Sequence, residues 1–401
     1  MRAPGLQSSI GAAAIACLLV GNAAAQVVLF AEDFDGLPLQ PSVDEFPFPE
    51  AFTPLPPPGW DRLDDVPGIG DPAVGVTEWE GWSFAAADFW QATADPSPRQ
   101  TFASGTGVIA VADPDQWNDL GNPANDDGGG FFNSFLTTPP IDISSSAPPD
   151  VRLKLGFDTT WLGGGCCDDG ENFQPPEQPE PFSNNQTAVI RLLTQGNEPI
   201  DVLRWEAAPF LGPDNEPRNQ PGPQTMPNPH FQPFIPDARI WLDLAPAQAA
   251  AMLNSMQAGD GSAGSGSGGG MAGLEFAMEN AGDDGYWALD NLEVFTITTL
   301  PGDMNVNGVL DSGDVPAFAL GLLDAIEYRN TYYGELPSTR GTEPDGTFDF
   351  DDIEWFVGVL ESGGVSTSVE QVAALLQPAP EPTSVALLAV ALSVSGGRRW
   401  R

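Results

Sequence analysis

Oxygen-bearing side chains alternate along residues 303–314 at a spacing that could wrap a hard cation. They stand at positions 1, 3, 5, 9 and 12 of a twelve-residue stretch, with Gly308 at position 6, where a tight turn is needed. Ca²⁺ takes about six to eight oxygen ligands, and a loop of about this length supplies them from alternate side chains and from the backbone carbonyl at position 7. The sequence therefore predicts a calcium loop. Its expected ligands are Asp303, Asn305, Asn307, Val309, Asp311 and Asp314.

An amphipathic helix is expected to leave this loop. Val315, Phe318 and Leu322 recur at the spacing of one helical face, and Pro316 stands in the first turn, where proline is tolerated. Residues 296–301, before the loop, have the composition of a strand end followed by a breaker. The predicted unit is therefore EF-hand-like, with a loop and an exit helix but without the entering helix of a complete EF-hand.

The pattern of loop and helix repeats 38 residues further along the chain (352 minus 314). Asp352 takes the place of Asp314, and Phe356 takes that of Phe318. Position 1 is Gly341, so one carboxylate is missing, and we expect this second loop to hold a cation more weakly than the first. The alternative for either loop is an acidic, glycine-rich turn that binds nothing. The candidate ligands of the second loop are Glu343, Asp345, Thr347, Asp349 and Asp352.

These two tandem repeats resemble the type I dockerin family over about residues 301–364, a minority of the chain. The resemblance implies a small calcium-folded module that docks a cohesin domain, with loop positions 10 and 11 helping to select the partner. Those positions hold Ser312-Gly313 in the first loop and Phe350-Asp351 in the second. The second pair departs from the small hydroxyl residues usual in the family. The partner, a cohesin-like protein or another surface protein, therefore stays open.

The charge of the chain narrows the class of partner. Its 14 Lys and Arg residues against 56 Asp and Glu residues give a net charge of −42. Such a chain repels nucleic acid and anionic lipid and attracts divalent cations, so no nucleic-acid role is expected. The same acidity could instead serve the solvation of a secreted protein. With 401 residues, 41% of them hydrophobic, the chain is long enough for two or three domains.

Residues 1–25 have the layout of a secretory signal peptide. Arg2 precedes an apolar run over residues 10–20, and small residues at 23–25 come before Gln26, where the exported chain would begin. We therefore expect a protein that is secreted or displayed at the cell surface.

Three features mark residues 380–401. A Pro-Glu-Pro motif at 380–382 is followed by an apolar stretch at 385–394 and by a basic end at 398–401. Together they resemble the PEP-CTERM sorting signal, which implies recognition at the membrane by exosortase-type machinery, removal of the tail, and display at or release from the cell surface. The apolar stretch of about ten residues is short of the ~20 that a membrane-spanning helix needs, so we expect membrane association to be transient.

The long region between these ends, residues 26–299, predicts an all-β domain. Short apolar runs separate turn signals, and several alternate apolar with polar residues, as over 152–157, which indicates strands with one buried and one wet face. We expect a single jelly-roll-like β-sandwich whose last strand returns beside the first. Residues 245–256 alone have a helical pattern. The expected strands cover residues 27–30, 107–112, 134–137, 151–160, 187–194, 240–244, 273–278 and 287–296.

The expected fold class is thus mainly β. A sandwich at 26–299 is followed by a small α-helical, dockerin-like calcium module at 300–364, a linker at 365–379 and the sorting signal at 380–401.

Three short stretches give the sandwich region a distant resemblance to bacterial secreted jelly-roll domains, such as carbohydrate-binding and MAM-type modules. They are residues 32–36, 138–143 and 289–291. In such folds an acid near the N-terminus and an Asp of the last strand can share a structural calcium, which makes Asp33 and Asp290 a candidate pair. The alternative is that Asp290-Asn291 merely shapes a turn.

An aromatic cluster in the sequence leaves the ligand of the sandwich open. It comprises Trp79, Trp82, Phe84, Phe89 and Trp90. Exposed tryptophan faces would stack on sugar rings, whereas buried ones would build the core of the sandwich. Carbohydrate is therefore a candidate ligand.

Little in the sequence supports catalysis. His230 is the single histidine, so neither a Ser-His-Asp relay nor a zinc site with several histidines can be assembled. Cys166 and Cys167 are adjacent, and they could form a vicinal disulfide, pair with other chains or stay free.

We therefore expect a non-catalytic exported surface or matrix protein that binds calcium and docks a partner through its helical module. Its sandwich would serve adhesion or bind a ligand such as carbohydrate. The alternative is a secreted polysaccharide-active hydrolase tethered through the module, because the 56 acids could include a glycosidase pair.

Overall fold

The computed structural model describes most of the chain. The described residues are 26–64, 75–94, 98–117, 132–143, 151–163, 186–194, 198–207, 232, 234–244, 271–281, 285–342 and 347–376. Several predicted features lie outside them. These are the signal peptide, the helix at 245–256, Cys166, Cys167, His230, Glu343, Asp345 and the sorting signal.

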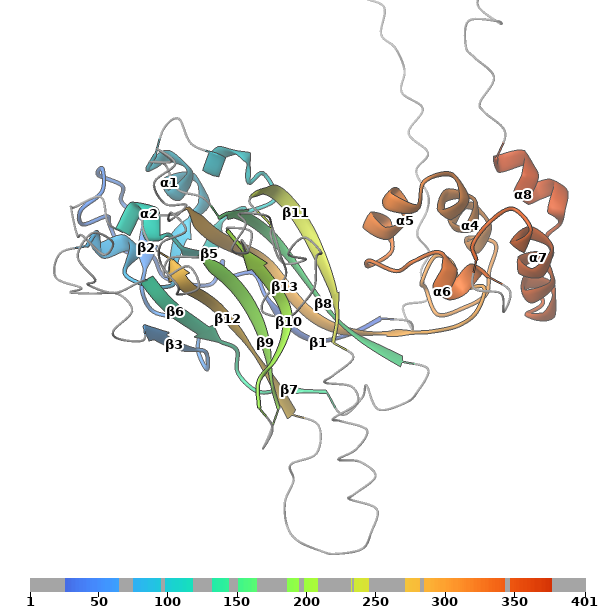
Figure 1. The fold of residues 1–401 in the computed structure, drawn as a ribbon, viewed down its shortest axis with the longest axis horizontal. Coiled ribbons are helices and arrows are strands. Elements are labelled where there is room, and N and C mark those ends of the chain that lie inside the picture. Colours follow the sequence, from blue (N-terminus) through green and yellow to red (C-terminus); the bar gives the residue numbers. More distant parts are fainter. Residues whose placement is uncertain are drawn as a thin grey trace, which may run out of the picture.

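Two antiparallel sheets make up the larger body (Figure 1), which confirms that the chain is mainly β. The first sheet has the order β11-β8-β13-β5-β4-β2, with β1 also paired to β13, and the second has the order β10-β9-β12-β6-β3, with β7 paired to β12. The strands of the first sheet are β1 (Gln26–Glu32), β2 (Phe52–Thr53), β4 (Ser83–Ala86), β5 (Val108–Ala112), β8 (Val151–Leu162), β11 (Phe234–Asp243) and β13 (Tyr286–Thr298). The strands of the second sheet are β3 (Asp61–Asp64), β6 (Phe132–Thr137), β7 (Ile141–Asp142), β9 (Thr187–Thr194), β10 (Ile200–Glu206) and β12 (Met271–Ala281).

The first and last strands of this body pair as expected. β1 runs antiparallel to β13, with Gln26 opposite Ile297 and Glu32 opposite Leu292. Each of the expected strands overlaps an observed one. The pattern behind the prediction is clearest in β6, where buried and half-buried residues alternate along the strand.

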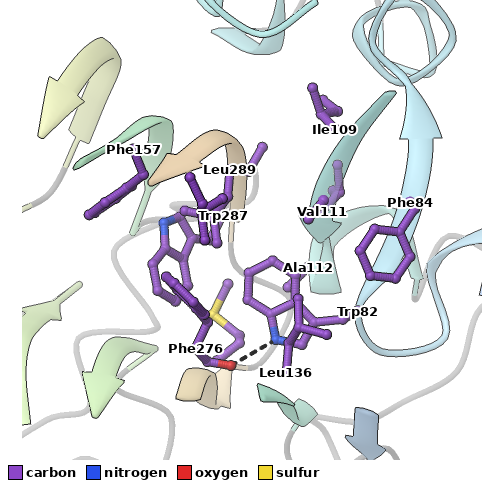
Figure 2. Close-up of a cluster of buried hydrophobic side chains, with 14 of the residues drawn as sticks. Trp82, Phe84, Ile109, Val111, Ala112, Leu136, Phe157, Phe276, Trp287 and Leu289 are labelled. Carbon is purple, nitrogen blue, oxygen red and sulfur yellow. Dashed lines mark hydrogen bonds between the residues drawn. The ribbon is translucent and has the colours of Figure 1, made fainter. Parts of the chain in front are cut away.

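The two sheets share one core. The ring of Phe276, on β12, lies 6.4 Å from that of Phe157 on β8 and 6.2 Å from that of Trp287 on β13. Trp82 lies 5.4 Å from Trp287 and donates its Nε1–H to the carbonyl oxygen of Phe276 at 3.1 Å (Figure 2). Aromatic side chains from both sheets therefore fill the space between them, and the indole N–H keeps a partner inside the core.

Short helical segments lie at one end of the sandwich (Figure 1). They are η1 (Thr77–Trp79), α1 (Ala87–Ala92), η2 (Pro98–Thr101) and α2 (Pro114–Trp117). Arg99 Nη2 lies 2.9 Å from Asp113 Oδ1 and 2.8 Å from Asp115 Oδ2, and the side chains of Arg99 and Asp113 are 2% and 0% exposed. Trp90 donates to Asp113 at 2.7 Å, and the ring of Tyr286 lies 4.9 Å from the guanidinium. This buried ion pair joins the helical segments to β13.

The C-terminal helices gather in a second body beyond the end of β13 (Figure 1). They are α4 (Asp314–Leu323), α5 (Ala325–Thr331), α6 (Ser338–Gly341), α7 (Asp352–Ser362) and α8 (Val369–Leu375). The helices α4 and α7 begin at Asp314 and Asp352, as the loop pattern predicts. The equivalent residues Phe318 and Phe356 stack with ring centroids 4.1 Å apart and an interplanar angle of 8°. The two repeats therefore pack against each other around a common core.

The structure differs from the expected linker at 365–379. The helix α8 lies inside this range, and Ser368 caps it through reciprocal hydrogen bonds with Gln371. Val372 is fully buried in the core of the helical body. The body thus extends past residue 364, because a serine cap and one buried apolar side chain hold a short helix that would be marginal alone. Among the described residues, no helix is both long and apolar enough to cross a bilayer.

Candidate metal centre

Two buried carboxylates bring the ends of the first loop together. Asp303 Oδ1 accepts from the backbone N–H of Asn307 at 3.0 Å, and its Oδ2 accepts from that of Gly308 at 2.9 Å. Asp314 Oδ1 accepts from the backbone N–H of Asn305 at 3.1 Å, and its Oδ2 accepts from that of Asp311 at 2.9 Å. Both side chains are fully buried. Positions 1 and 12 of the loop are therefore held by the loop's own backbone, and this backbone curls around them.

The remaining predicted side chains face the same space. The amide Nδ2 atoms of Asn307 and Asn305 donate to Asp311 at 3.0 and 3.4 Å. Asp311 Oδ1 also accepts from the backbone N–H of Gly313 at 2.6 Å. The backbone of Gly308 has φ +80°, a left-handed conformation that glycine adopts without strain and that the turn at position 6 requires.

The two buried aspartates of the first loop, Asp303 and Asp314, have raised pKa values. Burial is the largest cause and raises the pKa of Asp314 to about 7; the N–H groups of Asp311 and Asn305 lower it, and the charges of Asp303 and Asp311 raise it further. Burial also raises the pKa of Asp303, against the charge of Arg340. A divalent cation would relieve this crowding of negative charge.

The oxygen atoms of the first loop fit a hard cation, although its carboxylates alone are too few to surround one. In the part of the chain that the structure describes, no three Asp, Glu, His or Cys side chains are placed as a ready-made metal centre. In the first loop, the amide oxygens of Asn305 and Asn307 and the carbonyl of Val309 would have to complete the set begun by the aspartates. All of these donors are oxygen atoms, which is the ligand type that Ca²⁺ prefers.

In its C-terminal half, the second loop has the same hydrogen bond between positions 9 and 12 as the first loop. The backbone N–H of Asp349 donates to Asp352 Oδ2 at 2.8 Å, as Asp311 donates to Asp314. Thr347 and Asp349 are exposed, whereas Asp352 is buried. The two other candidate ligands lie outside the described residues, so the structure brings together only part of the predicted set.

Apolar side chains occupy the space beside position 1 of the second loop. A Cβ atom built on Gly341 would lie 2.5 Å from the ring of Phe348 and 3.0 Å from the sulfur of Met304. Glycine stands here because the neighbouring side chains leave no room for a larger residue.

We expect Gly341→Asp to lower the free energy of unfolding by about 1–3 kcal/mol, because the new side chain displaces Phe348 and Met304. The matched control is Gly358→Ala in α7, where a Cβ would meet nothing within 4 Å and helix propensity favours alanine. Urea unfolding of both variants measures the effect. A Gly341→Asp protein as stable as wild type would contradict this account of the position.

The carboxylate of Asp290 is hydrogen-bonded to the backbone of the sandwich. Its Oδ2 accepts from the backbone N–H of Thr106 at 3.0 Å and its Oδ1 from that of Asn291 at 2.7 Å. Burial, opposed by these bonds and reinforced by the charges of Asp158 and Asp35, raises its pKa to about 7. Asn291 has φ +51°, at an irregularity between Asp290 and Glu293 in the pairing of β13 with β8. These contacts match the alternative in which Asp290-Asn291 shapes the backbone.

Asp33 lines an open pocket of about 520 Å³ at the end of β1, which Asn291 also lines. Arg239 neutralises part of the acidity of this pocket, because it contacts Asp158 at 3.4 Å and also pairs with Glu293. The pocket is lined by Ala31, Glu32, Asp33, Asp158, Arg239, Asn291, Leu292 and Glu293.

The aromatic cluster belongs to the core. Trp79, Trp82 and Trp90 are fully buried, as are Phe84 and Phe89. The interpretation in which these tryptophans stack on sugar rings is therefore wrong. They are buried because they belong to one large apolar core that includes residues of both sheets and of the short helical segments.

One residue at the first loop was missed by the sequence analysis. Arg340 Nη1 lies 3.2 Å from Asp303 Oδ2, and the arginine is buried. The available signal was its place in the repeat, since 340 minus 38 is 302 and the backbone N–H of Gly302 donates to the carbonyl of Arg340 at 2.7 Å. Gly302 and Arg340 are the residues just before position 1 of the first and the second loop, and the repeat places them against each other. From this place the long side chain of Arg340 reaches Asp303 in the first loop.

Comparisons with known proteins add little to this picture. No family model matches the sequence, and no curated protein matches it. Among solved structures, an adhesin domain of Lys-gingipain from Porphyromonas gingivalis is 10% identical, with a TM-score of 0.29 over 67% of this chain and 98% of that one. A stig cyclase from Fischerella is 12% identical, with a TM-score of 0.31 over 68% and 99%. A carbohydrate-binding module with specific mannan recognition is 7% identical, with a TM-score of 0.26 over 69% and 100%. Similarity at this level carries no argument about fold or function.

Proposed function

We propose that this chain is an exported, calcium-binding surface or matrix protein whose dockerin-like helical module docks a protein partner. The sandwich serves adhesion or ligand binding. The partner is a cohesin-like protein or another surface protein, and exosortase-type machinery handles the C-terminal tail. The proposal for the module depends on the tandem loops, and the proposal for location depends on the signal at each end of the sequence.

One observation carries the calcium proposal. Asp303 and Asp314, eleven residues apart in sequence (314 minus 303), are both fully buried and accept hydrogen bonds from the backbone of the same loop. Burying two carboxylates close together is unfavourable unless a cation compensates them. Arg340 compensates Asp303 in part. Burial raises the pKa of Asp314 to about 7, although two backbone N–H groups donate to its carboxylate.

Calcium titration of the metal-stripped full chain tests the proposal. We expect calorimetry to show binding with a Kd of about 10⁻⁷–10⁻⁵ M, the range of EF-hand sensor loops. Calcium at about 100 times Kd should then stabilise the helical body by about 2.7 kcal/mol. Magnesium is the control, because it demands a smaller, octahedral site. If millimolar calcium produced no binding heat and no stabilisation, the proposal would be refuted.

The non-catalytic part of the proposal is supported by how the buried acids are used. A glycosidase needs two carboxyl groups that face a substrate across about 5–9.5 Å. Asp113 is bonded to Arg99, Glu335 to Lys154, and Glu78 accepts from the backbone N–H of Asp44 at 2.9 Å. These buried carboxylates are committed to holding the fold.

A polysaccharide panel tests this part. Incubation of the full chain with soluble and insoluble polysaccharides is expected to release no reducing ends, while retention on one of the solids would identify a carbohydrate ligand of the sandwich. Release of reducing ends at a rate proportional to protein concentration would establish the hydrolase alternative instead.

A further inference from the structure

The outer side of the first loop contacts the sandwich. Val306, at position 4 of the loop, is buried and packs with Phe295 and Ile297 of β13. Its backbone has φ +58°, a left-handed conformation that is rare for a β-branched residue and costs on the order of 1–3 kcal/mol. The loop adopts this conformation where its valine enters the apolar cluster with the sandwich. The same twelve residues thus turn oxygen atoms inward and an apolar side chain outward.

An aromatic contact extends this interface. The ring of Tyr333, after α5, lies 5.3 Å from that of Trp241 on β11 and 5.4 Å from that of Phe295, both in edge-to-face geometry. Tyr333 also has positive φ, at +54°. Gly334 approaches so closely that a Cβ built on it would lie 2.7 Å from the Cβ of Trp241. The segment after α5 is therefore shaped to fit the surface of the sandwich.

A buried charge network crosses the same interface. Glu335, on the helical side, accepts from Lys154 Nζ of β8 at 2.7 Å and lies 3.4 Å from Arg152. Glu335 and Lys154 are 0% and 2% exposed. Burial alone would raise the pKa of Glu335, but the charges of Lys154, Arg340 and Arg152 lower it. The carboxylate is therefore ionised, and removing its partners would leave it unpaired in the interior.

Arg340 connects this network to the candidate metal centre. Its Nε lies 3.2 Å from Glu335 Oε2, and its Nη1 lies 3.2 Å from Asp303 Oδ2, the acid at loop position 1. Its Nη2 donates to the carbonyl of Thr298, the last residue of β13, at 2.9 Å. A continuous path of buried hydrogen-bonded charges thus runs from Asp303 through Arg340 and Glu335 to Lys154.

We propose that cation binding at the first loop locks the helical body onto the sandwich, so that the metal sets the placement of the two bodies as well as the fold of the loop. This rests on the proposed function. A bound cation holds Asp303, and with it Arg340 and the outward Val306, in the arrangement that the interface requires. Without the cation, repulsion among Asp303, Asp311 and Asp314 opens the loop, and the interface loses both its apolar and its charged contacts.

Reciprocity makes the proposal measurable. If calcium favours the closed interface by some factor, closing of the interface strengthens calcium binding by the same factor, so loss of contacts made only at the interface should lower calcium affinity. Tyr333→Ala removes the ring contacts with Trp241 and Phe295, and Lys154→Gln removes the ion pair with Glu335; neither residue belongs to the loop. The matched control is Ile326→Ala, because Ile326 is 74% exposed on the helical body.

The experiment combines calorimetry with hydrogen–deuterium exchange of the full chain in calcium or chelator. We expect calcium affinity to fall about fivefold or more in both interface variants, because coupling between two sites typically changes affinity by at least this factor. The affinity of Ile326→Ala should stay unchanged. Chelation should speed exchange in peptides of β11, β8 and residues 332–341 of the wild-type protein. Two variants are used so that a folding defect in one, visible by circular dichroism, leaves the other informative.

The outcomes separate this proposal from the one on which it rests. If no calcium binds, the proposed function fails. If calcium binds and the interface variants bind it as tightly as wild type, with exchange at the interface insensitive to chelation, the locking proposal is overturned while calcium binding stands.

Discussion

Asp303→Asn is expected to weaken calcium binding by at least about 100-fold, which corresponds to about 2.8 kcal/mol. Asp303 is the first predicted donor of the loop, is fully buried, and is oriented by the backbone N–H groups of Asn307 and Gly308. The substitution keeps the shape of the side chain and removes its charge, and affinity in such loops depends on the number of charged ligands. Calorimetric titration of the full chain measures the change.

The control for this prediction is Asp351→Asn. Asp351 stands at position 11 of the second loop, is exposed, and is not a predicted ligand. Asp351→Asn changes the net charge by the same amount as Asp303→Asn, so it tests whether a change in net charge alone alters the calcium affinity. Equal affinities for Asp303→Asn and Asp351→Asn would show that calcium binds elsewhere or only as a diffuse counterion.

Asp113→Ala is expected to lower the free energy of unfolding of the sandwich by about 3–5 kcal/mol. Arg99 would remain in the interior without its principal partner, and Trp90 would lose the acceptor of its indole N–H. Asp115 would remain as a partner on one side of the guanidinium, but the arginine is 2% exposed, so water cannot replace Asp113. Chemical unfolding, followed by tryptophan fluorescence, measures the loss.

Two further variants show whether the buried charge is the cause. Asp115→Ala removes a partly exposed carboxylate from the same guanidinium and should cost clearly less, about 1 kcal/mol. Replacing the pair together, as Arg99→Met with Asp113→Leu, should recover much of the lost stability, because no buried guanidinium is left without Asp113, and the Asp115 carboxylate that also loses Arg99 is partly exposed. A single Asp113→Ala substitution that costs under 1 kcal/mol would contradict the assignment of this pair as a structural element.

If the loop locks the two bodies together, the surface left for a partner is restricted. Residues Val306, Tyr333 and Glu335 face the sandwich and are half-buried or buried. Phe350, at position 10 of the second loop, is 59% exposed. Under the proposed docking function, the second loop therefore presents an apolar side chain at a position implied to select partners, and it has Gly341 where the first loop has Asp303.

The sequence by itself determined the local features of this protein. The first loop was recognisable because its candidate donors lie within twelve residues, and their spacing alone decides which atoms can turn inward. The starts of α4 and α7 followed from the same short-range pattern, as did the strands whose alternation is long enough to see. A strand of two residues such as β2 carries no periodicity and was not predicted.

Only the tertiary structure decided what these features contact. Trp82 and its acceptor Phe276 are 194 residues apart, and Arg340 and Asp303 are 37 apart, so no local pattern could show that the indole is buried or that an arginine reaches the loop. The outward turn of Val306 likewise depends on a surface supplied by β13. Spacing along the chain specifies which groups a short segment offers, whereas burial and pairing depend on segments brought together by packing of the whole fold.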